Sequence, residues 1–309
     1  GSEMCIRDRY RNYIPDHYQF GYQLVAWSRE RYGDDMWSRV ADYGARRPYT
    51  ILTTKWALRK YYRTSVNRIA RSTLDDLTRF WRSQPVEPNS ASILPTPLTS
   101  YTVYRSPMRL DGSTLLALKK DMDRPNRLVA VDLATGRERR IAWTGSVNTP
   151  PVLGDSVIYW SEYRSSTLWE QRVFSVACRY DLRTGRRKTL RKRGNALYPT
   201  PLPGGRLVTV GYDYTGQYLL DRGDGRRFPF PRTMSVHGLA YDSLTRTLAF
   251  IGLDDEGMSI GAIDPESGAI RTLLKPSYVS IYNLRAGAGL LSFNSIQSGK
   301  DEIHLYDLR

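Results

Sequence analysis

The spacing of hydrophobic residues changes along the chain. Between about residues 10 and 85, bulky apolar side chains recur every three to four positions, as at Met36, Val40 and Tyr43. From Tyr101 onward they alternate with polar side chains or form short apolar runs, as in Leu128–Val131. Three-to-four spacing is typical of amphipathic helices, and alternation is typical of strands. The sequence therefore predicts a helical segment followed by a long β region.

Four short helices are predicted within residues 10–85. They cover about 18–32, 36–44 and 53–62, and the fourth opens at Ser65. Gly33 with the two aspartates after it predicts a stop and a new N-cap. The fourth helix carries the apolar residues Ile69, Leu74, Leu77, Phe80 and Trp81. Residues 86–100 are rich in proline and small polar residues, which predicts an extended connection and a domain boundary.

A recurring turn reveals a repeat in the β region. An Asp is followed four residues later by a Gly in four pairs: Asp132 and Gly136, Asp181 and Gly185, Asp221 and Gly225, Asp264 and Gly268. A last Asp stands at 307, and successive Asp positions are 49, 40, 43 and 43 residues apart. This period matches a four-stranded propeller blade, and the Gly supplies the positive φ that a tight hairpin needs.

The fold class predicted for the whole chain is mainly β with an α-helical N-terminal segment. Residues 101–309 are expected to form an incomplete β-propeller of about five four-stranded blades, in which the fifth blade lacks its fourth strand. A propeller closes by pairing its first and last strands, because an open edge invites aggregation. We therefore expect further blades, or a closing strand, in the intact protein.

Composition changes this picture little. Hydrophobic residues make up 40% and charged residues 25%, as in ordinary globular proteins. No stretch approaches the roughly 20 apolar residues that span a bilayer, so membrane association is expected only through segments missing from this sequence. The net charge of +15 comes mostly from arginine. Its densest run, residues 183–193, falls on a predicted strand pair without aromatic stacking partners, which favours a solvated edge over nucleic-acid binding.

The cysteines and histidines predict no catalytic, metal or cofactor site. Residues 1–9, through Glu3–Asp8, resemble a translated sequencing adapter and are set aside as an artefact, so the true N-terminus is expected to be missing. Cys178 then stands alone in an apolar strand, where a small core residue is expected. The three histidines, His17, His237 and His304, include no pair at helical spacing.

Three further motifs have structural explanations. Gly257–Gly261 matches the G-x-S-x-G pattern around Ser259, but it falls within a predicted third strand instead of a strand-to-helix elbow. Gly287–Gly289 is interpreted as a turn because no helix follows it. The acidic groups Asp121/Asp123 and Asp254/Asp255/Glu256 have oxygen ligands suited to calcium but lack an EF-hand pattern, so loop solubility is the favoured explanation.

The candidate binding residues lie in loops between second and third strands. They are Tyr163, Arg164 and Trp169 in the second blade, and Tyr212 and Tyr214 in the third. Tyr, Trp and Arg are enriched at binding hot spots. They predict a protein or peptide partner on one propeller face. The alternative is that Trp169 and the tyrosines pack between blades.

About two thirds of the chain resembles the TolB-type propellers of the bacterial cell envelope. The resemblance rests on Leu110–Ala117 followed by Leu128–Leu133, and on Ser298–Asp307. It implies a location in the bacterial periplasm or cell envelope. The propeller fold serves many functions, so this resemblance by itself implies no activity.

The helical segment resembles the last helices of a gluzincin-type zinc peptidase domain, through Tyr13–Tyr22 and Tyr32–Trp37. The zinc-binding His-Glu-x-x-His helix of that family is absent from this sequence, so no ligand can be assigned.

Three functions stay open. The chain is a non-enzymatic interaction scaffold whose helices act as an adaptor, the C-terminal accessory part of a secreted or envelope zinc metallopeptidase, or the propeller of a prolyl-oligopeptidase-type hydrolase. We favour the scaffold, because the residues present can bind but cannot cleave.

Overall fold

The computed structural model describes residues 17–84, 101–169, 171–190, 195–298 and 300–309. The chain divides into two compact units, Gly1–Ser92 and Ile93–Arg309. The predicted artefact at residues 1–9 and the predicted connection at residues 86–100 lie outside the described residues, as do residues 10–16.

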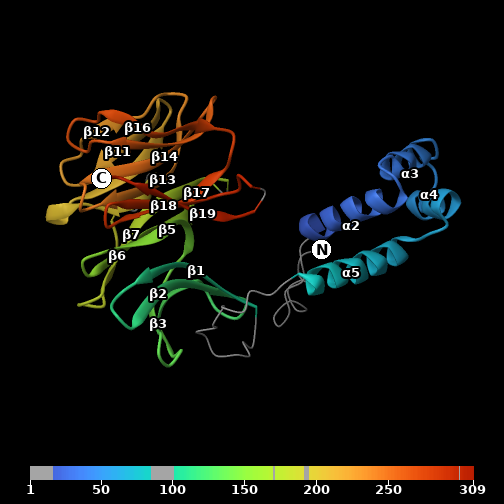
Figure 1. The fold of residues 1–309 in the computed structure, drawn as a ribbon, viewed down its shortest axis with the longest axis horizontal. Coiled ribbons are helices and arrows are strands. Elements are labelled where there is room, and N and C mark those ends of the chain that lie inside the picture. The colour runs from blue at the N-terminus through green and yellow to red at the C-terminus, as the bar shows by residue number, and fades with distance from the viewer. Residues whose placement is uncertain (1–16, 85–100, 170, 191–194, 299) are drawn as a thin grey trace. The chain divides into compact units, whose positions relative to one another are not determined.

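The first unit contains the four predicted helices (Figure 1). They are α2 (His17–Tyr32), α3 (Met36–Ala45), α4 (Thr53–Tyr62) and α5 (Val66–Ser83). Gly33 ends α2 with a φ of 103°, and Ser65 caps α5 because its hydroxyl accepts a hydrogen bond from the Arg68 N–H at 3.3 Å. The predicted cap at the start of α3 is wrong in detail. Asp35 has a helical backbone conformation and makes no side-chain cap hydrogen bond; it pairs with Arg39 instead.

The helical unit has a small core and an apolar surface. The core residues are Met36, Val40, Ala57, Leu58 and Ile69. On α5, Leu77 is buried as expected, whereas Leu74, Phe80 and Trp81 are each about half exposed. The predicted apolar face of this helix is therefore only partly covered among the described residues. None of the described helices is long and apolar enough to cross a membrane.

The second unit is a five-bladed β-propeller (Figure 1). Each blade is an antiparallel sheet whose strands pair in chain order. The first blade comprises β1 (Thr102–Arg109), β2 (Thr114–Asp121), β3 (Arg127–Asp132) and β4 (Glu138–Trp143). The second comprises β5 (Ser146–Gly154), β6 (Val157–Ser165), β7 (Val173–Asp181) and β8 (Arg187–Thr189). The third comprises β9 (Leu197–Pro201), β10 (Leu207–Asp213), β11 (Gly216–Asp221) and β12 (Arg227–Pro229).

The last two blades differ in strand number. The fourth comprises β13 (Ser235–Asp242), β14 (Thr247–Asp254), β15 (Gly257–Ile263) and β16 (Ile270–Ser277), and the fifth comprises β17 (Ile281–Gly287), β18 (Leu290–Ser295) and β19 (Glu302–Asp307). The fifth sheet therefore has three strands in the described part of the chain, as expected. The first strands of successive blades contact one another in chain order.

The predicted Asp-to-Gly turn is present at the end of the third strand of each of the first four blades. In the first blade, Asp132 Oδ1 accepts hydrogen bonds from the Ala134 and Thr135 N–H groups, and the Gly136 N–H donates to the Asp132 carbonyl. The glycines have φ values of 66°, 67°, 82° and 76°, in chain order. The Asp-to-Gly repeat therefore exists because this hairpin requires a residue that tolerates a positive φ.

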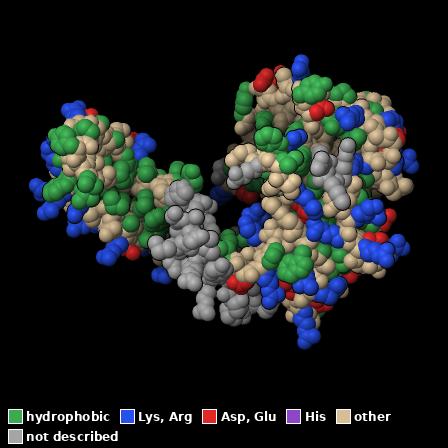
Figure 2. Space-filling view, turned by 180° about the vertical axis from the view of Figure 1, so that it is seen from behind, with side chains coloured by type: hydrophobic (Ala, Val, Ile, Leu, Met, Phe, Trp, Pro, Cys, Tyr) green, Lys and Arg blue, Asp and Glu red, His purple; other side chains and the backbone are tan. Residues whose placement is uncertain are grey.

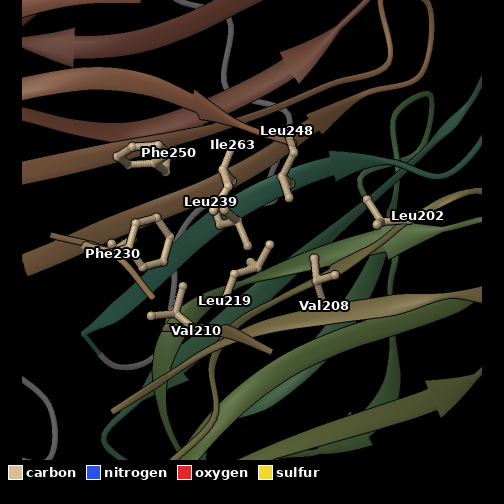
Figure 3. Packing of buried hydrophobic residues seen from close by; sticks show 10 residues of the cluster. Leu202, Val208, Val210, Leu219, Phe230, Leu239, Leu248, Phe250 and Ile263 are labelled. Carbon is tan, nitrogen blue, oxygen red and sulfur yellow. The ribbon is translucent and has the colours of Figure 1, made fainter. Parts of the chain in front are cut away.

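Hydrophobic clusters join most neighbouring blades. The cluster between blades three and four includes Val208, Leu219, Phe230, Leu239 and Phe250 (Figure 3). Cys178 is fully buried in the cluster that joins blades one and two, which confirms its predicted core position.

Hydrogen bonds supplement the contact between blades two and three. There, the Ser161 and Ser175 hydroxyls both donate to the carbonyl of Ala196, at 2.7 and 3.0 Å.

Candidate functional site

The antiparallel blades give the propeller two structurally distinct ends. At one end lie the turns between first and second strands and between third and fourth strands, which we call the turn end. At the other lie the loops between second and third strands and the connections between blades, which we call the loop end. Because β6 starts at Val157 next to the β5–β6 turn and finishes at Ser165, the predicted binding residues Tyr163 and Arg164 belong to the loop end.

The four predicted aromatic residues are exposed to solvent. The exposed fractions are 53% for Tyr163, 66% for Trp169, 40% for Tyr212 and 95% for Tyr214. Tyr212 lines a small hollow with Ser175 and Ala196 next to blade two, whereas Tyr214 is almost fully exposed. Tyr163 and Trp169 come from the second blade, and Tyr212 and Tyr214 come from the third. The structure thus places them on adjacent blades at the same end, and their role in binding stays a prediction.

The loops that carry these aromatic residues are held by local hydrogen bonds. Ser166 Oγ accepts from the N–H of Trp169 at 3.3 Å, and the Arg172 N–H donates back to the Trp169 carbonyl at 3.0 Å. In the third blade, Asp213 accepts from the N–H and hydroxyl of Thr215, and these bonds lower the pKa of its carboxyl. Tyr214 lies inside this hairpin turn, so a fixed backbone presents its ring to solvent.

Arg164 differs from the aromatic residues because it already has a protein partner. Its guanidinium donates to Glu162 at 3.0 Å while its side chain is 45% exposed. Glu162 is only 2% exposed, and it also accepts from Arg187 at 2.6 Å, from the Trp160 indole at 3.1 Å and from the Gly145 N–H at 2.8 Å. Arg164 therefore has a structural role in binding Glu162, and part of its side chain is also exposed to solvent.

Sequence reasoning missed several apolar residues at the loop end. Leu168 is 81% exposed and Tyr278 is 88% exposed, and Met122, Val173 and Ile296 are also exposed. They lie in or beside second-to-third-strand loops and blade connections. Their position in the repeat could have identified them, because each follows a second strand or precedes a first or third strand.

A cavity opens at the turn end of the propeller. It has a volume of about 770 Å³ and is lined by residues of blades two to five, including Tyr159, Arg206, Tyr241 and Arg285. Arg285 lies on β17 and was not singled out from the sequence. The available signal was that Arg285 is the one charged residue of this first strand.

The described residues hold no group of three or more His, Cys, Asp or Glu side chains that could bind a metal ion. Asp121, one of the candidate calcium ligands, forms an ion pair with Arg127 and accepts from the Asp123 and Arg124 N–H groups. Burial raises the pKa of its carboxyl. The hydrogen bonds and the arginine charge lower this pKa by more, so the net shift is downward. The Asp121 carboxylate is therefore already engaged in an ion pair and hydrogen bonds within its own blade.

Ser259 lies in a strand, as expected, and is buried. It belongs to β15, the third strand of blade four, and pairs with Gly252 of β14. His304, the histidine that follows it in the chain, lies on β19 and stacks on Phe293 with ring centroids 5.4 Å apart. No nucleophile elbow is formed, because β15 leads through a turn to another strand.

The positive charge is dispersed over the propeller. Figure 2 shows Lys and Arg side chains at many separate points of the visible face of this unit. Several of these arginines have carboxylate partners, as in the pairs Arg226 with Asp224 and Arg206 with Asp221. On this face (Figure 2) the basic side chains are therefore separated from one another, and some basic side chains of the propeller are paired with carboxylates.

The comparisons with known proteins identify the fold. No protein-family model matches the chain, and no curated protein matches it. Among solved structures, a puromycin-hydrolysing peptidase of Mycobacterium tuberculosis aligns with a TM-score of 0.52 at 15% identity, over 72% of this chain and 38% of that one. The chain thus spans well under half the length of that peptidase. The class of protein is a β-propeller protein with an N-terminal helical unit.

Two further solved structures are similar at lower scores. TolB from Acinetobacter baumannii aligns at 12% identity with a TM-score of 0.44, over 79% of this chain and 68% of that one. An acylaminoacyl peptidase aligns at 12% identity with a TM-score of 0.46, over 66% of this chain and 37% of that one. At these identities the similarity concerns the propeller fold alone.

Proposed function

We propose that this chain is a non-catalytic interaction module of a bacterial envelope protein, and that the loop end of its propeller binds a protein or peptide partner. The observation that carries this proposal is the exposure of Tyr163, Trp169, Tyr212 and Tyr214 on adjacent blades. Exposed apolar patches can mark protein-interaction sites, and Tyr and Trp are enriched among binding hot spots.

A rigid support strengthens this interpretation. The aromatic residues are carried by hydrogen-bonded turns on paired strands, so little conformational entropy is lost when a partner binds. Arg164 adds a guanidinium edge that a partner carboxylate or carbonyl can approach, while Glu162 fixes its position. The location in the envelope rests on the resemblance of the blades to TolB-type propellers.

The test begins with selection of peptides from a displayed library against the 309-residue chain. The affinity of the enriched peptides is then measured for Trp169→Ala and Tyr214→Ala. Loss of a hot-spot aromatic residue is expected to weaken binding by about 2 kcal/mol, or roughly thirtyfold. Leu244→Ala is the matched control, because Leu244 is 63% exposed but lies in the β13–β14 turn at the opposite end.

Two outcomes would contradict the proposal. The first is that no peptide is enriched above background, and the second is that Leu244→Ala weakens binding as much as the aromatic variants do. In the second case the effect of the aromatic variants is not specific to the loop end.

A second candidate function is the accessory part of a zinc metallopeptidase, and the observation that favours it is the apolar surface of the helical unit. Ile51 is 97% exposed, Tyr49 85%, Tyr18 76% and Tyr22 70%, and Figure 2 shows hydrophobic side chains on the visible face of this unit. Such a surface suits helices that pack against further protein. The propeller of a prolyl-oligopeptidase-type hydrolase is the third candidate, and similarity to the puromycin-hydrolysing peptidase is compatible with it.

Sequencing of the intact gene separates these candidates. A His-Glu-x-x-His helix with a downstream Glu ligand before Tyr10 would support the metallopeptidase. A strand-to-helix G-x-S-x-G elbow after Arg309, with an acid and a His following, would support the hydrolase. If neither is encoded, both enzymatic candidates are excluded and the interaction module is retained.

A further inference from the structure

The cavity at the turn end has the size of a ligand site. Its volume is about 770 Å³, within the range of about 300–1,000 Å³ that is usual for small-molecule sites. Its lining comes from residues 152–157 of blade two, 200–206 of blade three, 239–241 of blade four and 284–286 of blade five. Four blades therefore converge on one hollow, although their lining residues lie up to 134 positions apart in sequence.

Arg285 is the unusual residue of this cavity. It is half-buried, and its guanidinium makes one long hydrogen bond, 3.4 Å to the carbonyl of Pro151 across the propeller. Among the ion pairs of the described residues, none involves Arg285. Burial lowers the pKa of this guanidinium, and no anionic group offsets that effect. A guanidinium nevertheless stays charged in proteins. The Arg285 side chain is therefore a positive charge in a site from which water is partly excluded.

The other charges at the cavity do not neutralise Arg285. Arg206 is occupied by Asp221 at 2.5 Å and by Glu266. Arg183 and Asp155 also line the cavity, and both are exposed to solvent. Tyr159 and Tyr241 contribute apolar ring surface with polar hydroxyls. The cavity thus combines a partly desolvated cation with aromatic walls.

We propose that this cavity binds a small organic anion, and that Arg285 pairs with its carboxylate or phosphate group. The guanidinium offers a planar set of N–H donors that matches either anion with two parallel hydrogen bonds. An anion there would replace the missing partner of Arg285, and such a charge-assisted pair is stronger where water is excluded. The tyrosine rings would contact the organic part of the ligand. This site is independent of the loop end, which lies at the other end of the blades.

Binding is tested by calorimetry on the 309-residue chain with four probes at fixed ionic strength. Citrate and a tripeptide with a free C-terminus supply carboxylates, glycerol phosphate supplies a phosphate, and the same tripeptide amidated at its C-terminus lacks the anion. We expect at least one anionic probe to bind and the amidated peptide not to bind. The relative affinities of citrate, free tripeptide and glycerol phosphate distinguish a carboxylate site from a phosphate site.

Variants then assign the binding to Arg285. Arg285→Gln is expected to weaken the best probe by about tenfold or more, since it removes a charged donor pair. Arg271→Gln is the matched control, because Arg271 is exposed on the outer strand β16, away from the cavity lining. Asp155→Asn removes a carboxylate at the cavity and is expected to strengthen binding two- to threefold.

Three results would overturn the proposal: no anionic probe binds at millimolar concentration, the amidated tripeptide binds as well as the free one, or Arg271→Gln weakens binding as much as Arg285→Gln does. If Arg285→Gln does not fold, Arg285→Lys and Asp155→Asn decide the question. The lysine variant keeps the charge but loses the planar donor pair, so it is expected to bind several-fold more weakly. Unchanged affinity in both variants would then reject the site.

Discussion

Glu162 is a buried carboxylate with four donors around it. They are the Gly145 N–H, the Trp160 indole and the Arg164 and Arg187 guanidinium groups. Burial raises the pKa of Glu162, but the hydrogen bonds from Gly145, Trp160 and Arg164 and the charge of Arg187 lower it by more, and the net pKa is below its ordinary value. Stability linked to this group is therefore present above the unfolded-state pKa and is lost as pH falls through the folded-state pKa.

Glu162→Gln is expected to destabilise the propeller by about 1–2 kcal/mol at pH 7, because a neutral amide replaces the charged acceptor of four hydrogen bonds, while the part-exposed Arg164 and Arg187 can be hydrated. The difference from the parent chain should shrink as the pH falls below about 4, where a free Glu becomes protonated. Urea unfolding at several pH values measures this difference. Glu256→Gln is the control, since Glu256 is exposed in a turn. A difference of constant size from pH 7 to pH 3 would show that ionisation of Glu162 is not the source of its stability.

The burial of a single residue was predictable from sequence only where the adjacent residues of the chain determine its environment. Cys178 was correctly placed in the core, because an apolar strand surrounds it. The fourth helix was predicted with an apolar face, yet Phe80 and Trp81 are exposed. What covers a helical side chain depends on other segments, and spacing along one helix cannot supply that information.

At the scale of elements, the repeated hairpin turn offers a matched pair of glycines. Gly225 and Gly268 occupy the same position of the turn, with φ values of 82° and 76°. A Cβ on Gly225 would meet no heavy atom within 4 Å, whereas a Cβ on Gly268 would lie 2.6 Å from Cδ1 of Phe228 in the neighbouring blade. The two glycines thus share the backbone requirement and differ in packing.

Gly225→Ala is therefore expected to cost about 1 kcal/mol, the strain of a left-handed Ala. Gly268→Ala is expected to cost about 1–3 kcal/mol more, because it adds an overpacked contact between blades three and four. Thermal and urea unfolding of both variants measures the difference. Equal losses would mean that Phe228 moves aside freely and that only the backbone strain matters.

At the scale of the whole propeller, one arginine links two blades. Arg206, in the β9–β10 turn of blade three, pairs with the buried Asp221, at 2.5 Å, and with Glu266 in the β15–β16 turn of blade four. These hydrogen bonds raise the pKa of Arg206. Arg226 also contacts Glu266, at 3.1 Å, but its pairs with Glu266 and Asp224 are all about half exposed.

Arg206→Gln is expected to destabilise the protein by about 3 kcal/mol, since it leaves the Asp221 carboxylate buried without its cation. Arg226→Gln is expected to cost less than about 1 kcal/mol, as is usual for exposed ion pairs. Urea unfolding checks both values. A loss for Arg226→Gln as large as that for Arg206→Gln would indicate that the surface pairs, and not burial of Asp221, hold the two blades together.

The sequence by itself determined the number of blades, the order of the strands and the helical unit. These features depend on local patterns: alternation marks strands, and the Asp-to-Gly spacing marks a hairpin that only certain residues permit. The same repeat placed Tyr163 and Tyr214 in loops at one end of the propeller.

Only the tertiary structure decided which side chains meet. Arg285 and Pro151 come from the fifth and second blades, 134 positions apart, and Glu162 collects donors from three separate segments. No local pattern encodes such encounters, because they arise when the blades assemble around a common axis. The cavity at the turn end, and the cation held within it, therefore became visible only in three dimensions.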